Sequence, residues 1–374
     1  MTKTELLSRI DSKFRPMMVQ FLPANFYSYL YSNGRKSFIN MLASEIPQNV
    51  IVPTRHSKIL WDIEFQSNLF NAAGMFKKGE AYYTVAAQGA GAYLAGTTTA
   101  RYRRGNEKKG ILHPFASYPQ SAAALNWMGL PNEGHEVVAK RISGLDKQAG
   151  CPIGVSIGSS PEDTGLTALN GVLDGFRLYD KAGADFIELN ESCPNVVHEH
   201  DNNSEGGLDS MLVERLEFIS ENFLSIRDRN LPVILKISTD TEKELIPLLI
   251  NKLSELEFDG INIGNTSTDY ESARTMIAPN EMKTFDYFTK TFGGGLSGRP
   301  LKKKSLELSA LASEYISQSN IGREFHVIRT GGVENAGDLS RSEKAGVALN
   351  QWFTGYFDAF SLRGHKLYEE LLRT

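Results

Sequence analysis

Cysteine is scarce in this chain of 374 residues, which contains only Cys151 and Cys193. Two thiols are too few for the disulfide framework of a small secreted domain, so we expect a reducing compartment. Long apolar runs are missing too, and without a stretch of about 18 apolar residues no segment is expected to span a membrane. The amino terminus also lacks the apolar core of a secretory signal. These absences predict a cytoplasmic protein.

A large excess of either charge is also missing. The 40 Lys and Arg residues nearly balance the 44 Asp and Glu residues, which leaves a net charge of -4. A nucleic-acid surface needs a basic excess, and the run Arg101-Tyr102-Arg103-Arg104 is only a local one, so we expect no nucleic-acid partner. The 33 glycines are spread over many turns. This composition is typical of a large α/β enzyme.

The first 50 residues differ in pattern from the rest of the chain. Apolar residues at helical spacing precede Pro23, and an aromatic-rich segment follows at 26–42. We predict two or three short helices in a small N-terminal extension, residues 1–50, ahead of a catalytic domain of residues 51–374. The extension either packs on the main domain or uses its aromatic face as a peripheral contact with the inner side of a membrane, or as the entrance for a hydrophobic ligand.

Short apolar strands and amphipathic helices alternate regularly after residue 58. Eight parallel strands with intervening helices are the pattern of a (β/α)8 TIM barrel, whereas a doubly wound sheet needs fewer strands. We therefore predict an α/β fold of this class. The eight predicted strands are 70–74, 92–97, 153–158, 185–190, 233–238, 260–265, 325–330 and 347–354, and the helices between them include 80–88, 162–181, 208–228, 241–256, 301–317 and 335–345.

The stretch Phe186 to Asn195 carries the first chemical signal. It opens as an apolar strand and turns at Cys193-Pro194, since proline cannot continue a strand. Asn190 and Asn195 flank the thiol, so one group can take a proton while amides bind a ligand. A buried, inert cysteine is the alternative. The polar neighbours favour the functional interpretation.

The other strand ends of a barrel form the active site with this turn. They carry asparagines, two lysines and paired glycines but no cluster of His, Asp and Glu, so we predict no metal site. Glycines at 331–332 and 355, with the run 294–298, predict a phosphate site, because their N–H groups can approach an anion. Lys236 lies in an apolar strand, where its charge needs an anion or a developing negative charge such as that of a reduced flavin.

Four motifs in this order resemble the dihydroorotate dehydrogenase family, the FMN-dependent barrels of pyrimidine synthesis. They are Phe-Asn-Ala-Ala-Gly (70–74), Asn-Trp-Met-Gly-Leu-Pro-Asn (126–132), Leu-Asn-Glu-Ser-Cys-Pro-Asn (189–195) and Gly-Gly-Leu-Ser-Gly-Arg-Pro-Leu (294–301). The resemblance covers about residues 58–374. It implies oxidation of dihydroorotate to orotate, with FMN as the cofactor.

The resemblance also implies a role for individual residues. Cys193 is similar to the base that takes a proton from C5 of dihydroorotate while hydride leaves C6 for flavin N5, and the amides match the alternating N–H and C=O edge of the pyrimidine. The implied substrate contacts are Lys77, Asn126, Met128, Gly129, Leu130, Asn190, Asn195, Asn265 and Thr266. The implied flavin contacts are Ala73, Gly74, Thr97, Ser156, Asn190, Lys236, Gly298, Gly332, Thr354 and Gly355.

The pattern combines two classes of this family. The N-terminal extension, Lys77 and the 294–301 motif resemble the membrane-associated, quinone-using class, whereas a cysteine at 193 is typical of the soluble class. We expect a quinone as the electron acceptor, with fumarate or NAD as alternatives, and an oligomer is compatible with the family. Other interpretations are a flavin barrel acting on another dihydropyrimidine or cyclic amide, or a flavin-binding relative without turnover. The loop His198-Glu199-His200-Asp201 is expected to be a solvated flap rather than a metal cluster.

Overall fold

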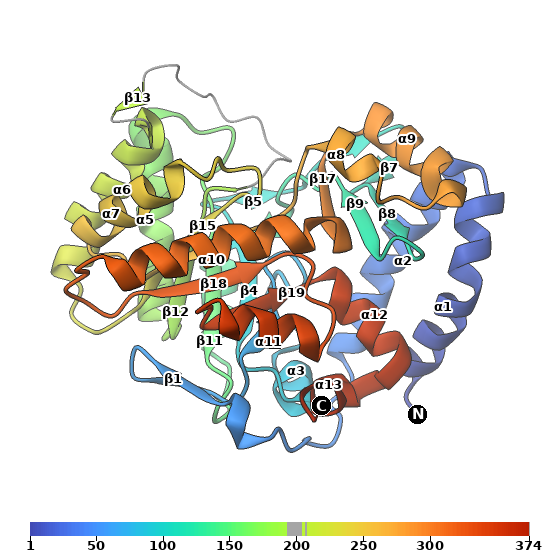
Figure 1. The fold of residues 1–374 in the computed structure, drawn as a ribbon, viewed down its shortest axis with the longest axis horizontal. Coiled ribbons are helices and arrows are strands. Elements are labelled where there is room, and N and C mark those ends of the chain that lie inside the picture. Colours follow the sequence, from blue (N-terminus) through green and yellow to red (C-terminus); the bar gives the residue numbers. More distant parts are fainter. Residues whose placement is uncertain (193–203, 206–207, 374) are drawn as a thin grey trace.

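The computed structural model describes residues 1–192, 204–205 and 208–373. Eight parallel strands form one sheet in the order β3-β19-β18-β16-β15-β12-β11-β4. This arrangement, with helices around it, confirms the predicted (β/α)8 barrel (Figure 1). The strands are β3 (Leu69–Asn71), β4 (Tyr93–Thr98), β11 (Ile153–Ile157), β12 (Phe186–Asn190), β15 (Val233–Ile237), β16 (Gly260–Ile263), β18 (His326–Thr330) and β19 (Leu349–Trp352).

The barrel helices agree with the sequence prediction to within a few residues at most ends. The largest difference is the predicted helix 208–228, which ends at Asn222 and continues as a short 3-10 turn, Leu224–Ile226. The helices are α3 (Tyr82–Gln88), α5 (Gly165–Lys181), α6 (Ser210–Asn222), α7 (Leu245–Glu255), α10 (Lys302–Gln318), α11 (Ala336–Lys344) and α12 (Thr354–Arg363), with α4 (His135–Ile142) before β11 and α13 (Leu367–Leu372) near the carboxyl end.

The barrel closes between β3 and β4 through a side chain as well as the backbone. The amide of Asn71 donates to the Leu94 carbonyl at 2.8 Å and accepts from the Leu94 N–H at 3.2 Å. Beyond the strand, Phe76 forms a parallel bridge with Ala95. An asparagine can replace a strand's backbone here because its amide carries both a donor and an acceptor.

Alternating strand residues fill the barrel interior in layers, because successive side chains of a strand point to opposite faces. The lowest layer is apolar and includes Phe186, Ile234 and Leu349, which belong to one buried cluster. The hairpin of β1 (Lys58–Leu60) and β2 (Ile63–Phe65) contributes to this cluster and closes the barrel floor. Two residues further along the strands, the interior becomes polar.

The N-terminal segment forms two long helices, α1 (Lys3–Phe21) and α2 (Ala24–Ala43). The prediction of two or three short helices was therefore wrong in length. A capping box between Thr2 and Glu5 starts α1, and Pro16 lies inside that helix without ending it. Figure 1 shows both helices, in blue, at one end of the barrel, beside α12 and the small sheet described next.

The two excursions between barrel elements pack on each other above the strand ends. Strand β17 (Gly295–Gly298) of the second excursion pairs antiparallel with β9 (Ala123–Asn126) of the first, and β9 pairs with β8 (Phe115–Tyr118). This pairing carries Asn126 to the mouth of the barrel. The remaining elements here are β5 (Tyr102–Arg103), β6 (Glu107–Lys108), β7 (Ile111–Leu112), β10 (Asn132–Glu133), α8 (Tyr270–Arg274) and α9 (Met282–Thr291).

The hydrophobic surface of the molecule is concentrated on the N-terminal helices. Exposed apolar side chains on α1 and α2 are Leu6, Leu7, Ile10, Phe14, Met17, Phe21, Phe26, Tyr29 and Leu30. Among the helices that the structure describes, none combines the length and apolarity needed to cross a membrane.

Candidate active site

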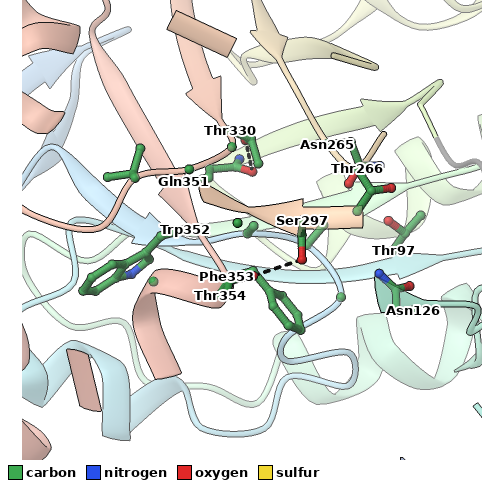
Figure 2. Close-up of a pocket in the computed structure, with 18 of the residues that line it drawn as sticks. Thr97, Asn126, Asn265, Thr266, Ser297, Thr330, Gln351, Trp352, Phe353 and Thr354 are labelled. Carbon is green, nitrogen blue, oxygen red and sulfur yellow. Dashed lines mark hydrogen bonds between the residues drawn. The ribbon is translucent and has the colours of Figure 1, made fainter. Parts of the chain in front are cut away.

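A cavity lies at the carboxyl ends of the barrel strands, under β9 and β17 (Figure 2). Most of the residues predicted for the site line it, although they come from distant parts of the chain. The predicted residues that line it are Ala73, Gly74, Lys77, Thr97, Asn126, Met128, Leu130, Asn190, Asn265, Thr266, Gly298, Gly332, Thr354 and Gly355. Ser297, from the predicted run 294–298, lines it as well. The sequence analysis missed Thr330, Val333, Glu334, Gln351, Trp352 and Phe353, which line it too.

One end of the cavity is a backbone cradle. Gly332 has a φ of +71°, and a Cβ there would lie 2.5 Å from the Cα of Lys302. A Cβ at Gly355 would lie 2.2 Å from the Val333 carbonyl oxygen. Helix α12 begins at Thr354, and no side chain caps its first N–H groups. Free N–H groups at a helix start, approached by glycine backbone, are suited to bind a phosphate.

Hydrogen bonds orient the amides and hydroxyls at the other end. The Asn190 amide donates to the Thr97 hydroxyl at 2.8 Å, which leaves its carbonyl oxygen to accept from the Ser192 hydroxyl at 2.8 Å. The Asn265 amide donates to the Ser192 hydroxyl at 2.9 Å and to the Ser192 carbonyl at 3.1 Å. Asn265 therefore holds the segment that leads to Cys193. Figure 2 shows Thr97, Asn126 and Asn265 around the same space.

Lys77 enters the cavity from the loop after β3. Its backbone N–H donates to the Glu80 carboxylate at 3.0 Å, and its Nζ lies 3.7 Å from the Met128 sulfur. The main chain of Lys77 is therefore anchored, and its side chain lines the cavity next to Met128. A cation so placed can bind a carboxylate ligand.

Below the cavity, Lys236 lies against a carboxylate that the sequence analysis did not identify. Lys236 Nζ is 3.4 Å from Glu188 Oε1, and both side chains are only 1% exposed. Gln351 connects this pair to the cavity, since its Oε1 accepts from Lys236 at 3.2 Å and its Nε2 donates to Glu188 at 2.7 Å. Asn262 donates to the other Glu188 oxygen as well, at 2.7 Å. The carboxylate and the ammonium thus satisfy each other in the barrel interior.

A second cavity lies between α1, α2 and the barrel. It is lined mostly by apolar side chains, among them Met18, Leu30, Phe38, Phe115 and Phe357. Both cavities share Phe353 and Thr354. A molecule bound between the helices would therefore lie next to a molecule bound in the barrel mouth.

The comparisons with known proteins identify the family. The model described as dihydroorotate dehydrogenase matches residues 56–373. The chain belongs to the dihydroorotate dehydrogenase family. Proteins named dihydroorotate dehydrogenase (quinone) are similar over most of their length. The protein of Nautilia profundicola is 30% identical over 80% of this chain and 73% of its own length. The protein of Kineococcus radiotolerans is 30% identical over 81% of this chain and 78% of its own length.

Solved structures agree on the fold of this dihydroorotate dehydrogenase family member. The crystal structure of DHODH from Eimeria tenella in complex with ferulenol superposes with a TM-score of 0.74, at 19% identity, over 91% of this chain and 89% of that one. The ligand-free form gives a TM-score of 0.71 at 20% identity.

Membership in the dihydroorotate dehydrogenase family implies a flavin cofactor, and the site residues fit one. A Cβ at Gly332 or Gly355 would collide with the backbone of Lys302 or Val333, so only glycine allows the close packing that forms the cradle. The buried Thr266 hydroxyl in the cavity wall has no hydrogen-bond partner within the described chain. An unpaired buried hydroxyl is costly, so a polar ligand is expected there. In the part of the chain that the structure describes, no group of three His, Cys, Asp or Glu side chains is arranged to hold a metal.

Some predicted residues do not line the cavity, and others cannot be placed. Ser156 is buried behind Thr97, with 3.0 Å between their hydroxyl oxygens. Lys236 lies one layer below the cavity, and Gly129 packs against Asn106. Cys193, Asn195 and the loop 198–201 lie outside the described residues. Glu188 could have been found from its position in the run Phe-Ile-Glu-Leu-Asn, where a carboxylate in a buried strand needs a partner.

Proposed function

We propose that this protein oxidises dihydroorotate to orotate, with FMN as its flavin and a quinone as its electron acceptor. The observation that carries the proposal is the family match, which extends over the residues that form the cavity. The cavity combines a phosphate cradle, a set of oriented amides and a lysine. These are the groups needed to bind a flavin phosphate and a small pyrimidine carboxylate side by side.

In this proposal the amides of Asn126, Asn190 and Asn265 bind the pyrimidine ring. An amide donates and accepts at once, so it complements the alternating N–H and C=O groups of dihydroorotate. Because Asn190 and Asn265 are held by Thr97 and Ser192, their donor and acceptor atoms point in fixed directions before substrate arrives. Lys77 binds the substrate carboxylate.

Cys193 is the proposed base for the proton on C5. It follows Ser192 directly, and Ser192 is held by Asn190 and Asn265. A free thiol has a pKa of about 8.5, so Cys193 acts as a base to the extent that its thiolate forms when substrate is bound. A flavin bound here would supply the acceptor for the hydride that leaves C6. Gly332, Gly355 and the start of α12 hold its phosphate.

The second cavity supports a quinone as acceptor. Its apolar lining suits a quinone ring and tail, and it meets the flavin cavity at Phe353 and Thr354. The similar curated proteins carry the name dihydroorotate dehydrogenase (quinone). We assign residues 1–50 as the extension that forms this cavity's outer wall and residues 51–374 as the FMN domain. The exposed apolar side chains of α1 and α2 provide a peripheral membrane contact from which a quinone can enter.

The test begins with anaerobic mixing of the flavin-loaded protein with dihydroorotate, followed by flavin absorbance. Rapid bleaching is expected. Cys193→Ala should retain the flavin and slow bleaching by about 10²- to 10⁴-fold, the usual contribution of a positioned base, whereas Cys151→Ala should bleach normally. No bleaching of the loaded wild-type protein would refute dihydroorotate as substrate and favour another cyclic amide or a protein without turnover.

The acceptor is tested by adding quinone, fumarate or NAD to the bleached protein. Quinone is expected to restore the flavin absorbance fastest. Gly34 lines the second cavity, and a Cβ added there meets no atom within 4 Å. Gly34→Leu should therefore fill part of the cavity and raise the KM for quinone at least tenfold without slowing bleaching, while Gly34→Ala is the matched control. Unchanged quinone kinetics in Gly34→Leu would mean that the acceptor binds elsewhere.

A further inference from the structure

A carboxylate lies inside the apolar cavity between α1 and α2. Asp358 is on α12, where Thr354, Phe357 and Asp358 occupy positions i, i+3 and i+4 and so share one helix face. All three residues line this cavity. One helical turn, roughly 6 Å along the axis, separates Asp358 from Thr354 at the junction with the flavin cavity. A single ring that touches the junction can therefore reach Asp358 as well.

Burial, rather than the charges around it, raises the pKa of the Asp358 carboxyl above its ordinary value. The nearest cation, Arg15 of α1, has an Nη1 atom 3.9 Å from the Asp358 carboxylate. Arg15 is already neutralised by Asp11, to which its Nε donates at 2.7 Å while its Nη2 makes a second short contact. Two carboxylates thus share one guanidinium. Partial burial raises the pKa of Asp358 to about 6; Arg15 and Arg299 oppose this rise and Glu334 adds to it.

The other charged or titratable groups near Asp358 each have a contact of their own. From α2, Tyr31 contributes a phenol that donates to Asp11 at 2.6 Å, and Arg35 contributes a cation over the Phe115 ring. On the barrel side, Glu334 pairs with Arg299 at 3.2 Å.

We propose that Asp358 is the proton donor to the quinone as it is reduced in this cavity. The inference rests on the proposed function, since it assumes a quinone acceptor. Reducing a quinone to a quinol takes two electrons and two protons. A reduced flavin in the barrel mouth would supply two electrons and one proton. The second proton leaves the Asp358 carboxyl as an O–H bond forms on the quinone oxygen. The resulting carboxylate takes up a proton from water, which reaches the side chain because 40% of it is accessible.

Asp358 fits this role better than its neighbours. Arg15 cannot release a proton at physiological pH. Burial and the Asp11 carboxylate raise the pKa of Tyr31, and its hydroxyl hydrogen is already directed to Asp11. Asp11 already accepts hydrogen bonds from both Arg15 and Tyr31. Among the charged groups lining this cavity, Asp358 thus combines a removable proton with access to water.

The experiment separates the two halves of the reaction in stopped flow. Asp358→Asn keeps the side-chain shape and removes the acid. In this variant, bleaching by dihydroorotate and reoxidation by ferricyanide, a one-electron acceptor that takes up no proton, should be unchanged. Reoxidation by a water-soluble quinone should be at least tenfold slower at pH 6, since general acids contribute about 10²- to 10⁴-fold. Asp228→Asn, at an exposed aspartate in a turn far from this cavity, is the control.

The pH profile provides the readout that a structural role would not change. In the wild-type protein, the rate of reoxidation by quinone should fall as pH rises through about 6, because the protonated donor is lost. Asp358→Asn should abolish this dependence and Asp358→Glu should restore it. Equal quinone rates and equal pH profiles in wild type and Asp358→Asn would overturn the inference. Failure of the wild-type protein to bleach, or to be reoxidised by quinone, would instead overturn the proposed function.

Discussion

The buried pair of Lys236 and Glu188 allows a prediction about stability. In Lys236→Met, the Glu188 carboxylate loses the cation that lies 3.4 Å away and stays in an interior where it was 1% exposed. Its hydrogen bonds from Asn262 and Gln351, both 2.7 Å, remain. We expect the variant to be destabilised because a charge is left buried without its counter-charge.

The structure sets the size of this effect. Removing one partner of a buried ion pair typically costs about 3–5 kcal/mol. The two retained amide donors continue to solvate Glu188, so we expect a loss near the lower limit, about 3 kcal/mol. Adding Glu188→Gln to Lys236→Met removes the unpaired charge and keeps an amide that can still bond to Asn262. The double variant should recover at least half of the loss, about 1.5 kcal/mol, and Glu188→Gln alone completes the cycle from which the coupling of the pair is calculated.

Denaturant unfolding of the flavin-loaded proteins, with equal excess flavin in every sample, measures this coupling. Equal excess flavin is needed because a bound ligand adds to apparent stability. The midpoint should shift while the slope of free energy against denaturant stays constant. Lys58→Met, which breaks the exposed pair with Glu343, is the control and should cost less than about 1 kcal/mol. Additive costs of the two interior substitutions would refute the idea that the pair is energetically coupled.

Two further predictions concern the cradle and the second thiol. Gly332→Ala should destabilise the protein by a few kcal/mol and lower the amount of flavin retained per protein, because the added Cβ would lie 2.5 Å from the Cα of Lys302. In the control Gly322→Ala the added Cβ meets no atom within 4 Å, so melting temperature and flavin content should be unchanged. Cys151 is 0% exposed, and burial raises the pKa of its thiol. In the Cys193→Ala variant, iodoacetamide at pH 7.5 should therefore label Cys151 only after unfolding, as measured by intact mass. Rapid labelling of the native protein would show that this core opens.

Local sequence patterns were sufficient for the barrel strands and most of the site. Short apolar runs ending in Asn, Gly or Thr mark strand ends, and a parallel barrel brings all such ends to one face. Asn190, Asn265 and Gly332 could therefore be assigned to one cavity from sequence spacing alone. Lys236 could also be identified as unusual from the sequence, because a charge in a buried strand needs a partner.

The identity of that partner required the tertiary structure. Glu188 and Lys236 are 48 residues apart, and they meet because β12 and β15 are neighbours with Asn190 paired to Lys236. The sequence shows that each side chain is buried but not which strands lie side by side. The closing contact between Asn71 and Leu94 depends likewise on the curvature of the whole sheet.

The sequence by itself determined the fold class, the strand ends and the family resemblance, because these depend on local periodicity and on short motifs. Only the tertiary structure decided the length of α1 and α2 and the cavity between these helices and the barrel. A helical pattern reveals which residues share a face but not what that face packs against. Asp358 has no motif around it, and it became a candidate proton donor only because α1 brings Arg15 and Asp11 to the wall of the same cavity.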